Sequence, residues 1–321
     1  MFTYAPLSFK LNRGKEAFMA AKGISFPNLH IHFANLPKTI NIFGLDIALY
    51  GIIIAVGMIA GLALGLYIAK KTNQDSDLYI DLAIFGIIFG VLGARIYYVL
   101  FSLDYYTNHP TEIIDIRQGG LAIYGGVIAA VITALVISKI KKAKFTLVAD
   151  TAIYGLILGQ IIGRWGNFVN REAYGQVTTL KNPLAMRLYF DNNFSILQVP
   201  PAIKQDMESL FHKPLSQIGF VQVQPTFLYE SLWNLIVLIL MLVFRKKKAF
   251  DGEILLWYLF GYGLGRFIIE GFRSDQLLIP GIGFPVSQLL SALLVITAVV
   301  IDVFVRVKKK NGNEAQSENN N

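Results

Sequence analysis

Long apolar runs dominate the chain and predict helices that cross a membrane. Several runs reach about 20 residues, the length of helix needed to span roughly 30 Å of hydrocarbon. We predict spans at residues 43–69, 81–101, 119–138, 146–163, 229–244, 253–272 and 284–305. The pattern therefore indicates an all-α membrane protein, a polytopic bundle of about seven transmembrane helices.

Lysine and arginine are unevenly distributed among the links between these spans. The links after the first, third and fifth spans, and the segment after the seventh, are basic: 70–71, 139–144, 245–248 and 306–310. The alternate links 102–118 and 273–283 hold one arginine each. Because basic links are retained in the cytoplasm, this alternation predicts an external N-terminus and a cytoplasmic C-terminus.

The segments outside the spans predict an extracytoplasmic structure. The link 164–228 is too long for a turn and is broken by prolines, so we expect a small extracytoplasmic head of short strands and loops. Residues 1–42 are expected to form an N-terminal arm on the same side, and 307–321 a disordered cytoplasmic tail. The spans then fall into helices 1–4 within 43–163 and helices 5–7 within 229–306.

Composition narrows the chemistry of the chain. Of its 321 residues, 54% are hydrophobic and 16% charged, and the net charge is +8. The excess positive charge lies mainly in the links predicted to be cytoplasmic, so it does not indicate a nucleic-acid partner. There is no cysteine, which excludes disulfides, thiolate nucleophiles and cysteine-ligated metals. His30 and His32 have metal-like spacing but lack carboxylate or cysteine partners, and no nucleotide-binding motif is present, so we predict neither metal nor cofactor.

Several polar side chains are predicted to lie at a similar depth, in the outer third of the bilayer: Tyr50, Arg95, Tyr124, Arg164, Glu230 and Arg266. A charge in hydrocarbon costs about 2.5–3.5 kcal/mol on insertion scales, so three arginines at one level indicate a shared purpose. One interpretation is internal pairing, since Arg266 and Glu270 are i,i+4 neighbours and Arg273 follows. The other is a bound anion, because the layer holds more positive than negative groups and arginine can donate two hydrogen bonds to a phosphate.

Four segments carry polar residues at the outer ends of the predicted spans: QGGLAIYGG (118–126), GRWGNFVNREAYG (163–175), QPTFLYE (224–230) and GYGLGRFIIEGFR (261–273). In residues, order and membrane position they resemble the prolipoprotein diacylglyceryl transferase family. Tyr50, in LYG, and Arg95, in GARIYYVLF, match further family positions. The resemblance therefore runs from about residue 43 to residue 305.

The resemblance implies a transferase of lipoprotein biosynthesis in the bacterial cytoplasmic (inner) membrane. In this family the diacylglyceryl group of phosphatidylglycerol moves to the lipobox cysteine of a prolipoprotein, which forms a thioether and releases glycerol phosphate. The expected partners are phosphatidylglycerol, prolipoproteins with a lipobox cysteine and membrane lipids, without nucleic acid. The nucleophile belongs to the substrate, which agrees with the absence of cysteine from this chain.

The resemblance also assigns roles to residues. Arg164 and Arg266 are expected to stabilise charge on the phosphate that leaves. The positions expected to bind substrate or to orient these arginines are Tyr50, Arg95, Gly125, Asn167, Asn170, Glu172, Gly175, Glu230, Tyr262, Glu270 and Arg273. Gly166 and Gly175 are expected to let the chain turn tightly where it leaves the helix.

Tyr124 is the third residue expected at the catalytic centre. Some relatives carry histidine at this position and at Gln224. A tyrosine, with a pKa of about 10, is a poor base at neutral pH, so we expect Tyr124 to donate a hydrogen bond to the lipid or the phosphate. Deprotonation of the substrate thiol is expected to depend on the arginines or on Glu172.

Two other functions fit the spans taken alone. A lipid or anion transporter would also use intramembrane arginines and glycine-rich helices. The halves of the chain, however, show no inverted repeat, and the charges lie toward one side of the membrane. A noncatalytic lipid-binding or scaffold protein would share the same spans, and covalent modification of a lipobox peptide would distinguish the enzyme from both.

Overall fold

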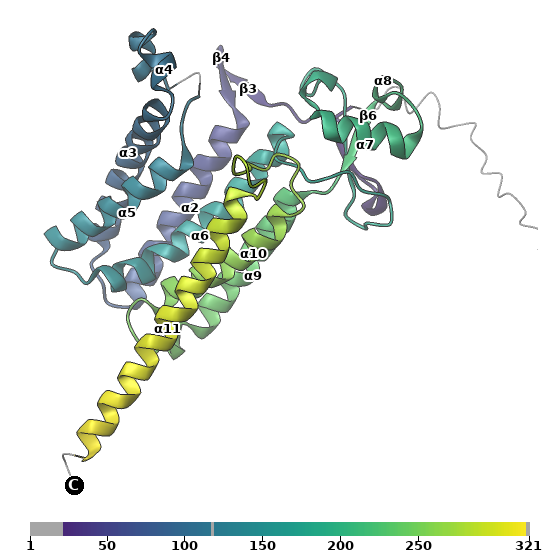
Figure 1. The fold of residues 1–321 in the computed structure, drawn as a ribbon. Helices are drawn as coiled ribbons and strands as arrows, with labels where there is room; N and C mark the ends of the chain where they lie inside the picture. The colour runs from purple at the N-terminus through teal and green to yellow at the C-terminus, as the bar shows by residue number, and fades with distance from the viewer. Residues whose placement is uncertain (1–21, 117–118, 319–321) are drawn as a thin grey trace, which may run out of the picture. The chain divides into compact units, whose positions relative to one another are not determined.

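The computed structural model describes residues 22–116 and 119–318 and consists mainly of long helices (Figure 1). Residues 1–21 of the predicted arm, Gln118 and the last three residues lie outside the described part. Helices of at least 18 residues in that part are α2 (Leu49–Lys71), α3 (Ser76–Leu100), α5 (Ile123–Ile140), α6 (Phe145–Asn170), α9 (Thr226–Phe244), α10 (Glu253–Glu270) and α11 (Val286–Glu318). Short helices α4 (Leu103–Tyr106), η2 (Pro110–Ile114) and η4 (Arg245–Lys247) lie in the links.

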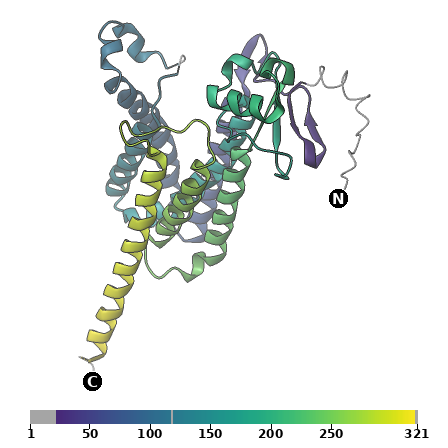
Figure 2. The ribbon, with the colours of Figure 1, turned by 45° about the vertical axis from the view of Figure 1, so that its right-hand side comes forward.

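Six of these long helices are long and apolar enough to cross a membrane, namely α2, α3, α5, α6, α9 and α11. Helix α10, which coincides with the sixth predicted span, is 18 residues long and includes Glu253, Arg266 and Glu270. The helical, multi-pass membrane protein predicted from the sequence is therefore confirmed, whereas the count of seven spans stays a prediction. Helix α11 continues to Glu318, so the structure has helix in most of the segment expected to be a disordered tail (Figure 2).

The described chain divides into two compact units. We call residues 22–54, 162–232 and 265–290 the head unit, and residues 55–161, 233–264 and 291–318 the helical unit. The ends of several long helices belong to the head unit, whereas most of their length belongs to the helical unit.

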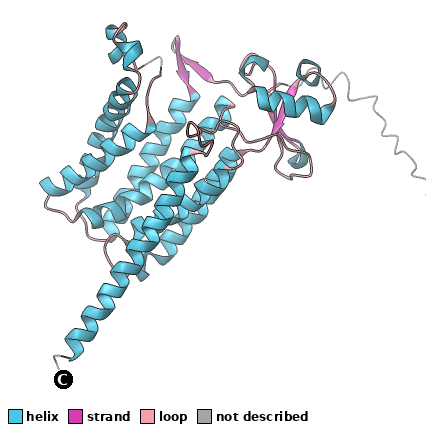
Figure 3. Cartoon of the chain, viewed as in Figure 1, coloured by secondary structure: helices cyan, strands magenta, loops and turns pink. Residues whose placement is uncertain are grey.

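The head unit contains a four-stranded sheet in the order β2-β1-β5-β6, drawn magenta in Figure 3. Its antiparallel strands are β1 (Ile24–Phe26), β2 (Ile31–Phe33), β5 (Met186–Tyr189) and β6 (Phe220–Val223). Ile24, Leu188 and Phe220 of these strands are fully buried. The hydrophobic core around them also includes residues of α7 (Pro201–Phe211) and α8 (Leu215–Ile218). The segment 164–228 supplies β5, β6 and these two helices, which were not expected in it, and residues of the predicted arm supply two further strands to the same sheet.

Short elements complete the head unit. The 3-10 turns η1 (Pro27–Leu29) and η3 (Ile196–Gln198) connect the strands and helices. A separate hairpin of β3 (Thr39–Ile42) and β4 (Leu45–Ala48) precedes α2.

One buried ion pair holds the head unit together. Arg171 follows α6 and donates to both carboxylate oxygens of Asp191, at 2.9 and 3.1 Å. The same carboxylate accepts the N–H of Gly23, at 2.9 Å. Burial lowers the pKa of Arg171, and the Asp191 carboxylate acts against that shift. The contact ties the exit of α6 to the loop after β5 and to the chain before β1.

In the helical unit, glycines allow helix backbones to approach closely. A Cβ at Gly61 of α2 would strike the carbonyl oxygen of Gly155 of α6, and the reverse also holds. In the same way, a Cβ at Gly93 of α3 would strike the carbonyl oxygen of Gly125 of α5, and a Cβ at Gly125 would strike that of Gly93. Small residues at four-residue spacing therefore pack helix on helix, as they commonly do in lipid.

Candidate functional site

Three arginines and two glutamates meet in the head unit. We call Arg164, Glu230, Arg266, Glu270 and Arg273 the arginine–glutamate cluster. Arg164 lies near the end of α6, Glu230 in the first turns of α9, and Arg266 and Glu270 in the last turns of α10, with Arg273 three residues beyond. Segments separated by more than 30 residues in sequence thus supply one polar site.

Glu230 is the centre of this cluster. Its Oε2 lies 2.5 Å from Nη2 of Arg164, and its Oε1 accepts a hydrogen bond from Nη1 of Arg266 at 3.0 Å. Nη1 of Arg273 is 3.6 Å from the same Oε1. The Glu230 side chain is only 5% exposed, so one buried carboxylate holds guanidinium groups from three parts of the chain.

Glu270 forms a second bridge between two of the arginines. Its Oε2 lies 2.8 Å from Nη2 of Arg266 and 3.8 Å from Nε of Arg273. Arg273 also makes a two-pronged contact with Asp275, at 2.9 and 2.8 Å. Burial acts to lower the pKa of Arg273, but the carboxylates of Asp275, Glu230 and Glu270 outweigh it and the pKa is raised. The i,i+4 pairing of Arg266 with Glu270 is thus present, but Arg266 is shared with Glu230 as well.

The balance of charge depends on which side chains are counted. The cluster holds three guanidinium groups and two carboxylates, all with side chains no more than 22% exposed. Asp275 would neutralise it, but its side chain is 45% exposed and therefore solvated. The buried part of the cluster keeps a surplus of one positive charge.

Arg164 is the member most open to a ligand. Its side chain is 22% exposed, the largest fraction in the cluster. Glu230 is its only polar partner among residues 22–116 and 119–318. A planar guanidinium with one edge held by a carboxylate leaves donors for a second anion.

The end of α6 continues the polar surface from Arg164. Asn167 lies three residues further along the helix, and its Nδ2 donates to Oε1 of Glu172 at 3.1 Å. Nδ2 of Asn170 donates to the same oxygen at 3.3 Å. Glu172 is exposed. The structure therefore brings these three predicted residues together, on a helix that extends to Asn170 and so beyond the predicted span.

The two glycines expected to turn the chain act differently. Gly166 is inside α6, and a Cβ there would strike the ring of Tyr50. Gly175 forms a bridge with Arg273, and a Cβ there would contact Gln224 and the carbonyl of Phe272. Neither has a positive φ, so the expected turning role is wrong for both.

The turn itself is made by non-glycine residues. Arg171 and Ala173 have φ values of 56° and 51°, in the left-handed region. The sequence gives no signal for this, because neither residue type favours that conformation. Gly166 and Gly175 instead permit close packing, and Gly175 joins three of the motif segments.

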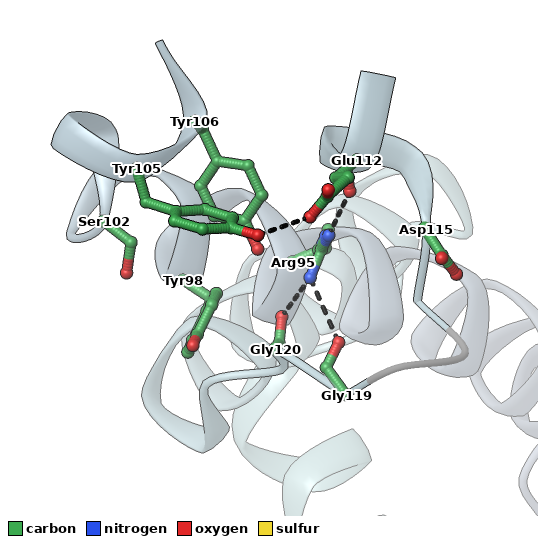
Figure 4. A pocket seen from close by; sticks show the side chains of 9 residues that line it. All are labelled: Arg95, Tyr98, Ser102, Tyr105, Tyr106, Glu112, Asp115, Gly119 and Gly120. Atoms are coloured by element: carbon green, nitrogen blue, oxygen red, sulfur yellow. Dashed lines mark hydrogen bonds between the residues drawn. The ribbon is translucent and has the colours of Figure 1, made fainter. Parts of the chain in front are cut away.

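A second polar group, in the helical unit, surrounds Arg95 (Figure 4). Its Nε donates to the carbonyl of Ile113 at 2.8 Å and its Nη2 to that of Glu112 at 2.5 Å. Its Nη1 donates to the carbonyls of Gly119 and Gly120, at 3.1 and 2.9 Å. Arg95 therefore fastens the link between α3 and α5 to α3.

A pocket of about 300 Å³ lies beside this arginine. Tyr98, Tyr105 and Tyr106 line it with Arg95 and Glu112, and the guanidinium of Arg95 stands 5.3 Å from the ring centre of Tyr106. Arg95 was expected to bind substrate. That role stays a prediction. In the structure, the hydrogen-bond partners of the Arg95 guanidinium are backbone carbonyls.

The remaining predicted residues also belong to the helical unit. Tyr124 is half-buried in the first turn of α5, and Gly125 packs against Gly93 and Tyr97 of α3. Tyr262 of α10 stacks on Tyr258, with ring centres 5.3 Å apart. Sequence reasoning did not identify Asp275, whose only signal is its position two residues after Arg273.

The chain is similar to known proteins over most of its length. Residues 37–304 match the family described as prolipoprotein diacylglyceryl transferase. A phosphatidylglycerol–prolipoprotein diacylglyceryl transferase of Listeria monocytogenes serotype 4a is 41% identical over 272 residues, which cover 85% of this chain and 90% of that protein. Proteins of the same name from Finegoldia magna and Clostridioides difficile are 42% and 37% identical, covering 82% and 84% of this chain and 93% and 95% of the relatives.

Proposed function

We propose that this chain, which belongs to the prolipoprotein diacylglyceryl transferase family, transfers the diacylglyceryl group of phosphatidylglycerol to the lipobox cysteine of prolipoproteins. The relatives' names supply the reaction and its two substrates. The observation that carries the proposal is the convergence of Arg164 and Arg266, from different helices, on the buried carboxylate of Glu230. Such a pair can bind a phosphate diester and stabilise the charge that develops when the ester breaks.

The transfer exchanges one bond for another at a glycerol carbon. The sulfur of the substrate cysteine attacks the carbon that joins the diacylglycerol to the phosphate, and a C–S bond forms. The C–O bond to the phosphate breaks, and its electron pair stays on the phosphate oxygen of the departing glycerol phosphate. The thiol proton leaves the sulfur before or during attack and passes to the departing phosphate monoester or to water, so atoms and charge balance.

Arg164 and Arg266 act on the leaving phosphate in this proposal. Arg164 has donors without a partner in the described residues, so it approaches the phosphate first. Glu230 and Glu270 are positioning residues, because each bridges arginines and restricts their rotation. Arg273 completes this frame through Asp275.

The polar end of α6 and the tyrosine beside it hold the rest of the lipid headgroup. Asn167 and Asn170 offer amide groups beside Glu172, which suits the hydroxyls of a glycerol. The ring of Tyr50, in the first turn of α2, packs on Gly166, which lies two residues along α6 from Arg164. Gly175 keeps Arg273 close to this end of the helix through its bridge.

The residues of the helical unit have supporting roles. Arg95 fixes the link that leads into α5 and thereby the start of that helix. Tyr124 donates a hydrogen bond to the lipid or its phosphate, and Gly125 sets the approach of α5 to α3. Tyr262, whose ring stacks on that of Tyr258, is the residue of this part of α10 that we propose to contact substrate.

The proposed location is the bacterial cytoplasmic membrane, with the N-terminus outside and the C-terminus in the cytoplasm. The alternation of basic links supports this orientation. It places the head unit and the end of α6 on the outer side, where a secreted precursor arrives.

The experiment combines purified protein, phosphatidylglycerol vesicles and a synthetic lipobox peptide, followed by mass spectrometry. A mass gain of one diacylglyceryl group on the peptide cysteine is expected, and Arg164→Ala and Arg266→Ala should abolish it while the protein still inserts. An unmodified peptide with lipid or anion flux across the vesicles would instead identify a transporter. An unmodified peptide without flux would leave a noncatalytic lipid-binding protein.

A further inference from the structure

A hairpin with one apolar face precedes the first membrane-spanning helix. In the antiparallel pair β3–β4, Ile40 lies opposite Ile47 and Ile42 lies opposite Leu45. Side chains alternate between the two faces of a strand, so these four residues share one face. All four are exposed, Leu45 to 70%. An unpaired hairpin with this much exposed apolar surface is uncommon unless something covers that surface.

The opposite face of the hairpin is polar. Nδ2 of Asn41 donates to Oδ1 of Asp46 at 2.8 Å, and these residues are cross-strand partners. The N–H of Gly44 donates to Oδ1 of Asn41 at 3.1 Å. The hairpin is therefore amphipathic, and the polar face forms its own hydrogen bonds.

The turn at the tip carries an aromatic residue where the backbone favours another type. Phe43 and Gly44 form a two-residue turn with φ values of 51° and 84°. Positive φ at both positions is characteristic of a type I′ turn, which favours Asn or Asp at the first and Gly at the second. A bulky residue at that first position is unfavourable, and Phe43 is fully exposed. The turn therefore does not explain why phenylalanine stands at this position, whereas a contact outside the hairpin would.

The position of the hairpin in the chain indicates what it contacts. Strand β4 ends at Ala48 and α2, with a mean hydropathy of 2.5, begins at Leu49 (Figure 1). The N–H of Leu49 donates to the carbonyl of Lys38 at 2.9 Å, which closes the base of the hairpin against the helix. Four residues of strand extend about 14 Å, so Phe43 cannot lie far from the membrane surface that α2 enters.

We propose that the β3–β4 hairpin inserts Phe43 and its apolar face into the phospholipid leaflet at the N-terminal end of α2. The occupant is lipid because this face is continuous in the chain with a membrane-spanning helix. Amphipathic elements with aromatic residues bind at the boundary of headgroups and acyl chains in this way. The insertion fixes the start of α2, where Tyr50 packs against Gly166. The proposal depends on α2 spanning the membrane and not on the proposed catalysis.

Single labels can test this because the chain contains no cysteine. The variants Phe43→Cys and, on the polar face, Asp46→Cys would each carry one nitroxide in the full-length protein. In vesicles of phosphatidylglycerol and phosphatidylethanolamine, the ratio of collisions with oxygen to collisions with a water-soluble nickel complex reports contact with lipid. The expected ratio is several-fold higher at position 43 than at position 46. Equal ratios would overturn the proposal.

A second variant separates membrane contact from the shape of the turn. Phe43→Asn creates the residue pair that a type I′ turn favours, so the hairpin is retained while the aromatic contact is lost. A nitroxide at Ile42→Cys should then show at least a twofold lower ratio in the Phe43→Asn background. An unchanged ratio would contradict the role of Phe43. If the ratio at position 43 is high only when lipobox peptide is added, the apolar face binds the precursor and not lipid, and the proposal is wrong.

Discussion

Glu230→Gln is the most informative single change in the arginine–glutamate cluster. The substitution keeps the size of the side chain and removes its charge. It leaves the three arginines of the cluster with one buried carboxylate, that of Glu270, which contacts Arg266 and Arg273. The new amide also brings an N–H group to the place where Nη2 of Arg164 now lies 2.5 Å from a carboxylate oxygen. One arginine at least must therefore leave its present position.

The expected loss of turnover in Glu230→Gln follows from how deeply Glu230 and its arginines are buried. Glu230 is 5% exposed and its two closest arginines are 22% and 16% exposed. Removing one partner of a buried ion pair costs about 3–5 kcal/mol, and a misplaced donor to a developing oxyanion typically costs about 10²–10³-fold in turnover. We expect kcat to fall by that factor. The KM for phosphatidylglycerol should change little, because the positive surplus still attracts an anion.

The assay is turnover of a lipobox peptide, measured by mass, with phosphatidylglycerol varied. Glu208→Gln is the matched control, since Glu208 lies on α7 and its Oε1 accepts the N–H of Leu215 at 2.8 Å, which an amide oxygen can also accept. Glu230→Gln activity within threefold of the unmodified protein would refute the reasoning.

The other predictions concern single residues. Tyr124→Phe should lower turnover by no more than about tenfold, because one neutral hydrogen bond contributes about 0.5–1.5 kcal/mol; complete loss with normal lipid binding would show that Tyr124 is essential to the chemistry. Arg95→Lys keeps the charge but loses the forked donors, so limited proteolysis should cleave 112–120 faster; a higher KM for lipid without faster cleavage would show that Arg95 binds substrate. Burial, aided by Asp275, raises the pKa of Tyr174 from 10.0 to about 12. The unfolded chain ionises this tyrosine near pH 10, whereas the folded chain still holds it neutral. The contribution of Tyr174 to the free energy of unfolding should therefore not change below pH 10, and should be lower by about 2–3 kcal/mol above pH 12. Tyr174→Phe should flatten that dependence, and an unchanged pH profile would exclude Tyr174 as its cause.

The sequence predicts which of these side chains lie at one level along the helices better than it predicts their partners. Rise along an apolar span can be counted, which assigns Arg164, Glu230 and Arg266 to one level from the sequence alone. The i,i+4 pairing of Arg266 with Glu270 also follows from helix geometry. The contact of Glu230 with Arg164 and Arg266 does not, because it depends on how each helix is rotated about its axis and packed.

Arg95 illustrates the same limit in another way. Its depth resembles that of Arg266, yet its donors bind carbonyls of the link 112–120. That link has no hydrophobic periodicity from which its path could be predicted. The pairing of β1 with β5, more than 160 residues apart in sequence, was likewise beyond reach, since strands of three or four residues carry too short an alternation to identify a partner.

A structure determined with phosphatidylglycerol bound would test the central claim most directly. We expect phosphate oxygens of the lipid at hydrogen-bonding distance, about 2.7–3.2 Å, from the guanidinium groups of both Arg164 and Arg266, with Glu230 still in contact with at least one of them. A phosphate held elsewhere, with Arg164 and Arg266 bound only to Glu230 and Glu270 as they are in the lipid-free chain, would contradict it.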